Sequence, residues 1–271
     1  MSCELSWGWG WGEMAEVLLH VLGSYSDAES RTDVDRAWGA GDPGACLLLG
    51  EESRGRSSLL FLAAAEAAGH GGRRVLFLAP RPVQALPAPL LLLEPGSLRR
   101  VEFAYPRTAD GLLRALATLH RSPRGGLPSL LLLDGLDRYL RGCGPETAQR
   151  AARIAALLRD SAGWLSQQQQ PGARCHIIAA LKAPMPEESA SDSFLPIIER
   201  YFPVKCMVRE ELCEPEGVQR YLISFSGLAT HDTEGPPESQ KVEDCTWELL
   251  YEADKVTGIH LVARQAKQLG D

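Results

Sequence analysis

The stretch LLLGEESRGRSSLLFLAAAEAAG, Leu47 to Gly69, decides how this chain folds. A short apolar run ends at Gly50, four residues precede Gly55, and two hydroxyl residues then open an alanine-rich segment. This order predicts a buried strand, a loop and a helix closed by Gly69. The spacing matches the phosphate-binding loop G-x-x-x-x-G-K-[ST], except that Arg56 stands where the motif has lysine.

Such a loop suits an anion because backbone N–H groups face the ligand at a helix N-terminus, where the helix dipole favours negative charge. Ser57 stands at the position of the hydroxyl that ligates Mg²⁺. Arg56 keeps the positive charge, but a planar guanidinium is not equivalent to the compact ammonium of lysine. Glu51 and Glu52 add negative charge to the loop. We therefore expect ATP binding to survive in weakened form and turnover to be lost first.

A second motif, LLLLDG, places Asp134 at the end of another apolar run. A carboxylate at the carboxyl end of a buried strand is where phosphate-loop proteins hold Mg²⁺. Asp137 leaves two interpretations open, a second acidic group or a residue that caps or solvates the next helix, and we favour the latter. The predicted nucleotide-binding residues are Gly50, Gly55, Arg56, Ser57, Ser58 and Asp134, of which Ser57 and Asp134 are the metal ligands.

Hydrolysis needs a further carboxylate that orients the attacking water. The segment FLAPRPVQALP, residues 77–87, follows the first helix and contains no acidic residue. Together with Arg56, this predicts that ATP hydrolysis is weak or absent.

The rest of the chain predicts the fold class. Continuous apolar strands alternate with helices, which is typical of a parallel sheet covered on both faces, and the late strands alternate as antiparallel edge strands do. We expect an α/β phosphate-loop core at residues 43–228. A disordered Trp/Gly-rich extension is expected at 1–42, a flexible insertion at 229–244, and terminal strands with a tail at 245–271.

Composition narrows the function classes. The chain has 271 residues and a net charge of −7, which argues against a generic nucleic-acid binder. However, the segment from His70 to Arg124 holds nine arginines against three acidic residues. The seven scattered cysteines form no C-x-x-C pair, which predicts reduced thiols and no zinc site. No apolar run is long enough for a membrane span.

Three phrases, SLLLLDGLDRYL, RVLFLAPRPVQALP and ERYFPVKCMV, resemble the family of vertebrate Shu-complex ATPase subunits. These are atypical paralogues of the RecA-type recombinases, and the resemblance spans residues 45–225. It implies a RecA-like core and a nuclear protein of homologous recombination and DNA repair. It also implies a SWIM-domain zinc-finger partner, contacts with recombinases and their paralogues, binding of single-stranded DNA, and support of recombinase filaments. Arg56 departs from the lysine of the family's loop.

The resemblance gives two further sites a meaning. Phe61 to Ala64 matches the F-x-x-A tetrapeptide by which recombinases dock on one another, with core packing as the alternative. The segment Lys182 to Ser193 lies where the RecA family has a DNA-contacting loop, but it holds three acidic residues and no aromatic residue for base stacking. We therefore expect weak, salt-sensitive DNA binding. The predicted DNA-binding residues are Arg99, Arg100, Arg107, Arg114 and Lys182.

Three functions stay open at this point. The first is a recombination accessory factor with a degenerate ATPase fold. The second is an active stand-alone phosphate-loop ATPase or kinase, and the third is a scaffold that binds no nucleotide.

Overall fold

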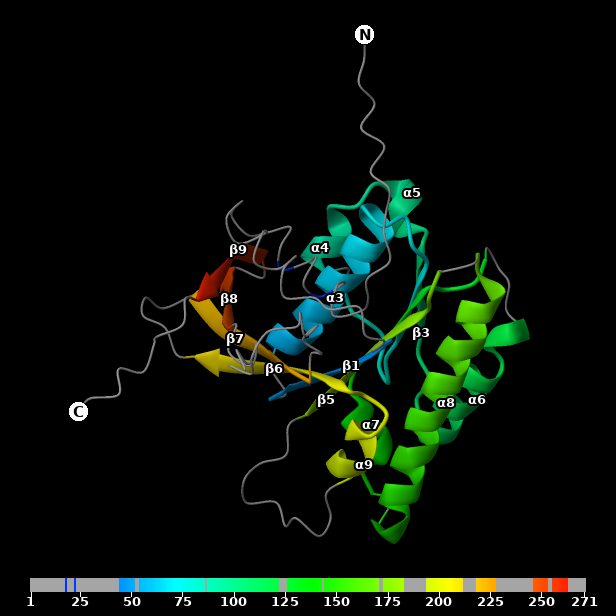
Figure 1. The fold of residues 1–271 in the computed structure, drawn as a ribbon. Coiled ribbons are helices and arrows are strands. Elements are labelled where there is room, and N and C mark those ends of the chain that lie inside the picture. Colours follow the sequence, from blue (N-terminus) through cyan, green and yellow to red (C-terminus); the bar gives the residue numbers. More distant parts are fainter. Residues whose placement is uncertain are drawn as a thin grey trace, which may run out of the picture.

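The centre of the protein is one mixed β-sheet (Figure 1). This computed structural model describes residues 18, 22, 44–51, 54–85, 87–121, 126–142, 144–170, 173–182, 194–211, 218–227, 246–252 and 255–262. Within these ranges the sheet has nine strands in the order β3-β2-β4-β5-β1-β6-β7-β8-β9. Their bounds are β1 Ala45–Gly50, β2 Val75–Leu78, β3 Val101–Ala104, β4 Leu130–Leu133, β5 His176–Lys182, β6 Val204–Glu211, β7 Val218–Ser226, β8 Thr246–Glu252 and β9 Lys255–Val262.

The strands from β3 to β6 in this order run parallel. Strands β1, β2 and β4 are buried throughout, as their continuous apolar sequences predict. Because parallel strands end at the same edge, β1, β5 and β4 bring their carboxyl ends together, with β5 in the middle. Gly50 of β1 lies opposite Lys182 of β5. Both predicted motifs therefore follow strands that end at this carboxyl edge.

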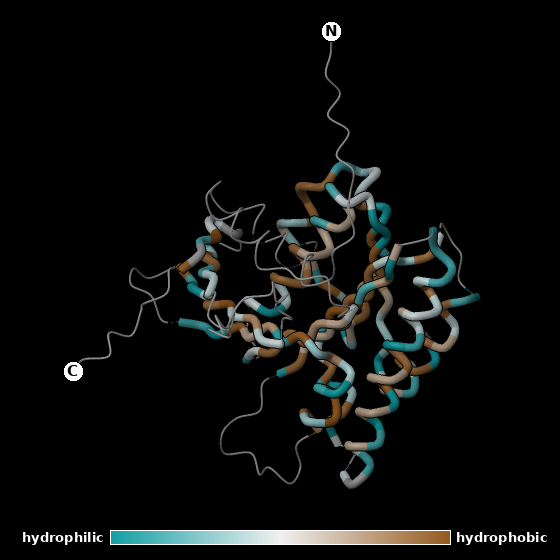
Figure 2. Tube along the Cα trace, viewed as in Figure 1, coloured by the Kyte–Doolittle hydropathy of each residue, from teal (hydrophilic) through white to brown (hydrophobic). Residues whose placement is uncertain are grey.

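Helices cover the two faces of the sheet (Figure 1). One face carries α3 (Arg54–Gly69), α4 (Ala88–Leu91) and α5 (Pro95–Leu98), and the other carries α6 (Ala109–Ala117), α7 (Leu136–Leu140), α8 (Thr147–Gln168) and α9 (Leu195–Glu199). Each face has its own apolar cluster, so Cys46 and Leu48 of β1 pack on the α3 side whereas Leu47 and Leu49 pack on the α8 side. Figure 2 shows the hydrophobic residues concentrated along the central strands.

Strands β7, β8 and β9 extend the sheet beyond β6 in antiparallel order. Burial alternates along β7 and β8, which places Tyr221, Ile223 and Trp247 in the α3-side cluster. The predicted α/β fold is therefore confirmed: a mostly parallel sheet flanked by helices, with antiparallel strands at the C-terminal end.

Two residues of the predicted N-terminal extension contribute to this core. Leu18 and Leu22 are helical and fully buried in the α3-side cluster. The rest of the segment up to residue 43, the predicted insertion at 229–244 and the tail from residue 263 lie outside the described residues, and the predicted boundaries stay predictions.

Local sequence explains two helix starts near the carboxyl edge. Gly135 has φ 67°, so the turn from β4 into α7 needs the left-handed conformation that glycine adopts most readily. Thr108 caps α6, because its hydroxyl accepts a hydrogen bond from the Gly111 N–H at 3.1 Å. None of the helices in the described part of the chain is long and apolar enough to cross a membrane.

Candidate nucleotide-binding site

The predicted phosphate loop joins β1 to α3, and its two glycines are required by packing. A Cβ atom at Gly50 would lie 2.9 Å from the carbonyl oxygen of Val208 on β6, and one at Gly55 would lie 2.5 Å from the ring of Tyr221 on β7. Both distances are too short for a side chain. The start of α3 is therefore built directly against the C-terminal strands, and residues 52 and 53 of the loop lie outside the described residues.

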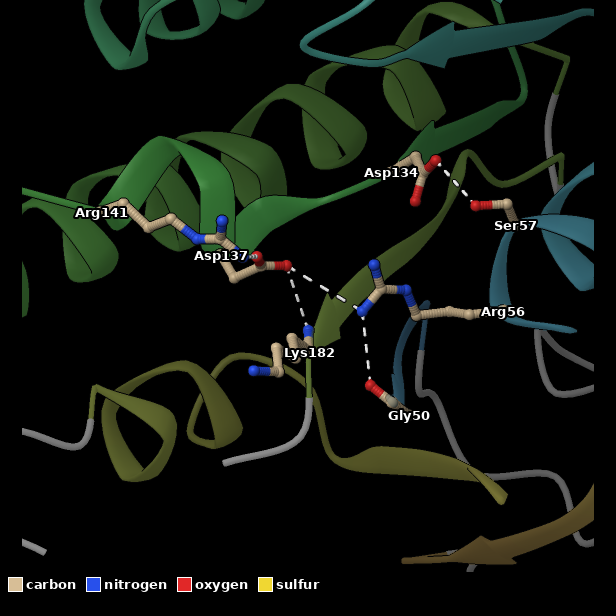
Figure 3. A network of polar contacts seen from close by, with 7 residues as sticks. All are labelled: Gly50, Arg56, Ser57, Asp134, Asp137, Arg141 and Lys182. Carbon is tan, nitrogen blue, oxygen red and sulfur yellow. Dashed lines mark hydrogen bonds and ion pairs between the residues drawn. The ribbon is translucent and has the colours of Figure 1, made fainter. Parts of the chain in front are cut away.

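Arg56 is buried, and Figure 3 shows its guanidinium directed toward Asp137 and Gly50. It is 3% exposed, its Nη1 donates a long hydrogen bond of 3.4 Å to the carbonyl of Gly50, and the same atom lies 4.0 Å from Oδ1 of Asp137. Its Nε atom is buried and has no hydrogen-bond partner among the described residues. The contacts of the guanidinium are therefore weak, and its Nε–H group remains available to donate a hydrogen bond.

Ser57 and Asp134 join the two motifs (Figure 3). The Ser57 hydroxyl donates to Oδ2 of Asp134 at 3.0 Å, across 77 residues of sequence. The other carboxylate oxygen, Oδ1, is buried and accepts no hydrogen bond within the described part of the chain. Ser58, the remaining hydroxyl of the predicted set, is buried in the same helical turn. The structure therefore gathers Gly50, Arg56, Ser57 and Asp134 at one place, as the motif spacing predicts.

The surroundings of Asp134 act on its acidity in opposite directions. Burial raises the pKa of its carboxyl above the ordinary value, and this effect outweighs the Arg56 charge and the Ser57 hydrogen bond, which both lower it. The charge of Arg138 also favours the ionised form, whereas the neighbouring Asp137 opposes it. The ionised Asp134 is consequently under-stabilised, and a bound cation would favour it.

Asp137 does not cap or solvate the next helix, contrary to the interpretation favoured from sequence. The residue is 6% exposed, in the first turn of α7. Its Oδ1 accepts a hydrogen bond from the backbone N–H of Lys182 at 3.1 Å, and its Oδ2 accepts one from Arg141 at 3.0 Å. Through these two hydrogen bonds and the ion pair with Arg56, Asp137 links the end of α7 with the end of β5 and the start of α3 (Figure 3).

Sequence reasoning missed two residues that shape this site. Arg138 lies over Gly135, with its Cδ 3.3 Å from a Cβ built there, and its charge acts on Asp134. Tyr221 comes from β7, far from either motif, and its ring closes the space beside Gly55. The run DGLDRYLR contains a signal for Arg138, because charged residues three and four positions apart share one helix face. No motif points to Tyr221.

These residues fit a nucleotide phosphate with Mg²⁺. The buried unpaired Nε of Arg56 is a donor for a phosphate oxygen, and the buried unpaired Oδ1 of Asp134 is an acceptor for Mg²⁺ or its water. No group of three or more His, Cys, Asp or Glu side chains that could hold a metal ion occurs in the described ranges. A magnesium ion here therefore needs phosphate oxygens as ligands, as is usual for Mg²⁺ in nucleotide sites.

The candidate docking residues lie beside this helix. Phe61 is half-buried and stacks on Phe77, with ring centroids 4.8 Å apart and planes 7° apart. Phe103 continues the aromatic row, and Ala64 is fully buried in the cluster on this face. This is the arrangement that the core-packing alternative describes, and a docking role stays a prediction.

The five predicted DNA-binding residues do not form one surface. Arg107 follows β3 and Lys182 ends β5, so both belong to the carboxyl edge, whereas Arg99 and Arg100 precede β3 at the opposite edge. Arg100 donates to the carbonyl of Ala68 at 2.9 Å and thereby satisfies the C-terminal end of α3. The fifth residue, Arg114, lies exposed on α6. The acidic segment 183–193 lies outside the described residues.

Comparison with known proteins agrees with this geometry. The chain is 41% identical over 199 residues to the mouse ATPase SWSAP1, covering 73% of this chain and 68% of that protein. It is 41% identical over 177 residues to the human ATPase SWSAP1, covering 65% of this chain and 75% of that protein. The chain belongs to the SWSAP1 family. The resemblance seen in the three sequence phrases is thereby confirmed.

The comparison with solved structures covers a larger share of the chain. The crystal structure of the RadB recombinase superposes with a TM-score of 0.52 and 12% identity, covering 83% of this chain and 94% of that one. This likeness establishes a RecA-type fold for the chain. No protein-family model matches the sequence.

Proposed function

We propose that this chain is an accessory factor of homologous recombination that binds ATP with Mg²⁺ and hydrolyses it weakly or not at all. One observation carries the nucleotide part: Arg56 and Asp134 each keep a buried polar atom without a partner in the described site, one a donor and the other an acceptor. Buried polar groups are rarely left unpaired, and a phosphate together with a cation would satisfy both atoms. Membership of a family whose members are named ATPases supports the same ligand.

The roles of the residues follow from their positions. Arg56 would neutralise a phosphate oxygen, Ser57 would turn its hydroxyl oxygen from Asp134 toward the metal, and Asp134 would hold the metal or its water. The bound Mg²⁺ would supply charge neutralisation to the phosphates. Residues 79–87, beyond β2, contain no acidic residue that would orient a water. This composition and the arginine at position 56 support binding without efficient turnover.

The recombination role rests on the family and on the recombinase-type fold. Under this proposal the chain acts in the nucleus within a Shu-type complex, with a SWIM-domain protein as partner. It binds single-stranded DNA weakly, and it supports filaments of recombinases and their paralogues.

The melting temperature of the full chain, with and without millimolar Mg-ATP, tests the nucleotide part. A ligand at 100 times its dissociation constant stabilises a protein by about 2.7 kcal/mol, which is a shift of several degrees for a domain of this size. We expect a shift in the parent and none in Ser57→Ala/Asp134→Ala, with Arg141→Gln as a charge-changing control on the outer side of Asp137.

A second candidate, a scaffold that binds no nucleotide, is favoured by one specific contact. Asp137 already supplies a carboxylate to Arg56, so an internal anion stands where a phosphate would. Absence of any shift in the parent, combined with retained partner binding, would establish the scaffold and exclude ATP as a ligand.

A further inference from the structure

Arginines gather at the amino ends of the parallel strands, opposite the nucleotide site. Arg73 and Arg74 precede β2, and Arg99 and Arg100 precede β3. The two pairs lie side by side, because the backbone N–H of Val75 donates to the carbonyl of Arg100 at 2.9 Å. Neighbouring strands are about 4.8 Å apart, so four guanidinium groups start from a very small part of the surface.

The same edge continues across β4 to β5. Ser129 donates its N–H to the carbonyl of Arg74 at 2.9 Å, and His176 donates its N–H to the carbonyl of Ser129 at 2.9 Å. Arg174 lies two residues before His176 and is exposed. The amino edge therefore presents arginines at β3, β2 and β5 along one line.

Helix ends bring an aromatic group to this line. The side chain of Gln169, just past α8, donates to the carbonyl of Pro128 at 3.0 Å, so α8 ends beside the start of β4. Trp164 in the last turns of α8 is half-buried and meets His120 edge-on, with ring centroids 6.3 Å apart. His120 belongs to the short 3-10 helix η1 (Leu119–Arg121), whose last residue, Arg121, is exposed.

Three of the six arginines on this edge, Arg100, Arg121 and Arg174, are engaged within the chain. Arg100 serves the C-terminus of α3, and Nε of Arg121 donates to Nε2 of His120 at 3.2 Å. Within the described part of the chain, Arg73, Arg74 and Arg99 form neither an ion pair nor a side-chain hydrogen bond. Glu66 is close in sequence to Arg73 and Arg74, but its carboxylate pairs with His70.

Like charges on adjacent strands destabilise a sheet, so this arrangement costs stability in the free protein. In a chain with a net charge of −7, it also runs against the overall charge. A polyanion that lies along the edge removes the repulsion. The half-buried Trp164, which meets His120 next to Arg121, favours single-stranded nucleic acid over an acidic peptide, since exposed bases stack on aromatic rings and phosphates follow a cationic track.

We propose that the amino edge, formed by Arg73, Arg74, Arg99, Arg121, Trp164 and Arg174, binds single-stranded DNA. This inference rests on the DNA-binding part of the proposed function and assigns it to a surface away from the segment after Lys182. The nucleotide site and this surface then lie at opposite edges of the parallel part of the same sheet, so both ligands bind at once without contact between them.

The test uses the full chain and a fluorescein-labelled oligothymidylate, followed by anisotropy over a range of salt concentrations. The variant Arg73→Gln/Arg99→Gln removes one charge before each of β2 and β3. The matched control Arg81→Gln/Arg107→Gln removes one exposed charge after each of the same strands. We expect the first variant to weaken binding about tenfold and to reduce the slope of log affinity against log salt by about 1.4, and the control to stay within about twofold.

A second comparison checks the aromatic group. We expect Trp164→Leu to lower affinity roughly fivefold or more and Trp164→Phe, which keeps an aromatic ring, to restore most of it. Equal effects of the two arginine pairs, with binding intact in the parent, would overturn the amino-edge assignment and leave DNA binding itself in place. No salt-sensitive binding by the parent would instead reject the DNA-binding part of the proposed function. If polyglutamate binds equally tightly, the ligand of this surface is an acidic protein partner rather than DNA.

Discussion

Arg56 and Asp137 form a buried ion pair, with Nη1 and Oδ1 4.0 Å apart, at the place where the phosphate-loop motif predicts a bound anion. The separation is too long for a hydrogen bond, and the arginine keeps an unpaired Nε. Asp137 is held more firmly on its other sides, by Arg141 and by the Lys182 amide. The arginine is therefore the partner that is free to exchange one anion for another.

Replacing Asp137 by asparagine removes the competing charge while leaving an oxygen for the Lys182 amide. We expect the variant to unfold more easily without ligand, by about 1–3 kcal/mol, because a buried guanidinium loses its partner. The Mg-ATP-induced rise in melting temperature should be larger than in the parent. Arg141→Gln, which removes only the exposed partner of the same carboxylate, is the control, and an unchanged nucleotide response in Asp137→Asn would show that the pair does not compete with phosphate.

Arg56→Lys restores the standard motif at its single departure. We expect tighter Mg-ATP binding, because a compact ammonium approaches the phosphates more closely, but no gain in phosphate release, because residues 79–87 supply no carboxylate for the water. Steady-state phosphate release and thermal shift measured on the same samples separate the two effects. Turnover in the variant would mean that another residue activates the water.

Asp134 predicts a pH dependence of stability. Its pKa is raised by burial above the ordinary 3.8, so the folded chain binds this proton more tightly than the unfolded chain does. The free energy of unfolding therefore falls as pH rises from that value through the raised pKa. We expect the free energy of unfolding of Asp134→Asn not to fall over this pH range and to exceed that of the parent at neutral pH. Urea unfolding at several pH values measures both. The same variant should lose the magnesium dependence of the nucleotide response.

Gly55→Ala tests the contact between α3 and β7. Alanine favours a helix over glycine by about 1 kcal/mol, yet a Cβ here would meet the Tyr221 ring at 2.5 Å. We expect the clash to dominate and to destabilise the protein by about 1–3 kcal/mol. In a Tyr221→Leu background the cost should shrink or reverse. For the same reason, loss of nucleotide binding in a Gly55 variant would report a damaged fold.

Phe61→Ala separates packing from docking. Since Phe61 stacks on Phe77, we expect a loss of about 3 kcal/mol in the free energy of unfolding. Phe61→Leu keeps most of the apolar volume and should retain stability. If Phe61→Leu folds well but no longer captures a recombinase in a pull-down, the docking interpretation gains the support that packing alone does not give.

Sequence predicts the core of this protein well because its signals are local. A glycine spacing, an apolar strand and a helix start lie within one short stretch, and they place Ser57 against Asp134 through the common edge of parallel strands. The same reasoning finds the antiparallel strands from their alternation. Each of these steps uses residues that are neighbours in sequence or in strand order.

The sequence does not reveal the features that depend on distant packing. Asp137 follows Asp134 by three residues and looks like a helix residue, but its burial depends on where Arg56 and the end of β5 lie. Tyr221 is unremarkable in β7 until the start of α3 is placed beside it. The arginines of the amino edge are separated by up to about a hundred positions, so only the strand order brings them together.

The burial of Leu18 and Leu22 has a consequence for how the chain is made. They belong to the same apolar cluster as Trp247, Leu249 and Ile259, so this cluster is complete only after the last strands have been made. At about 5–20 residues per second, these leucines wait roughly 10–50 seconds for their neighbours. Until then the cluster is incomplete, and the growing chain exposes apolar residues that a chaperone would have to shield.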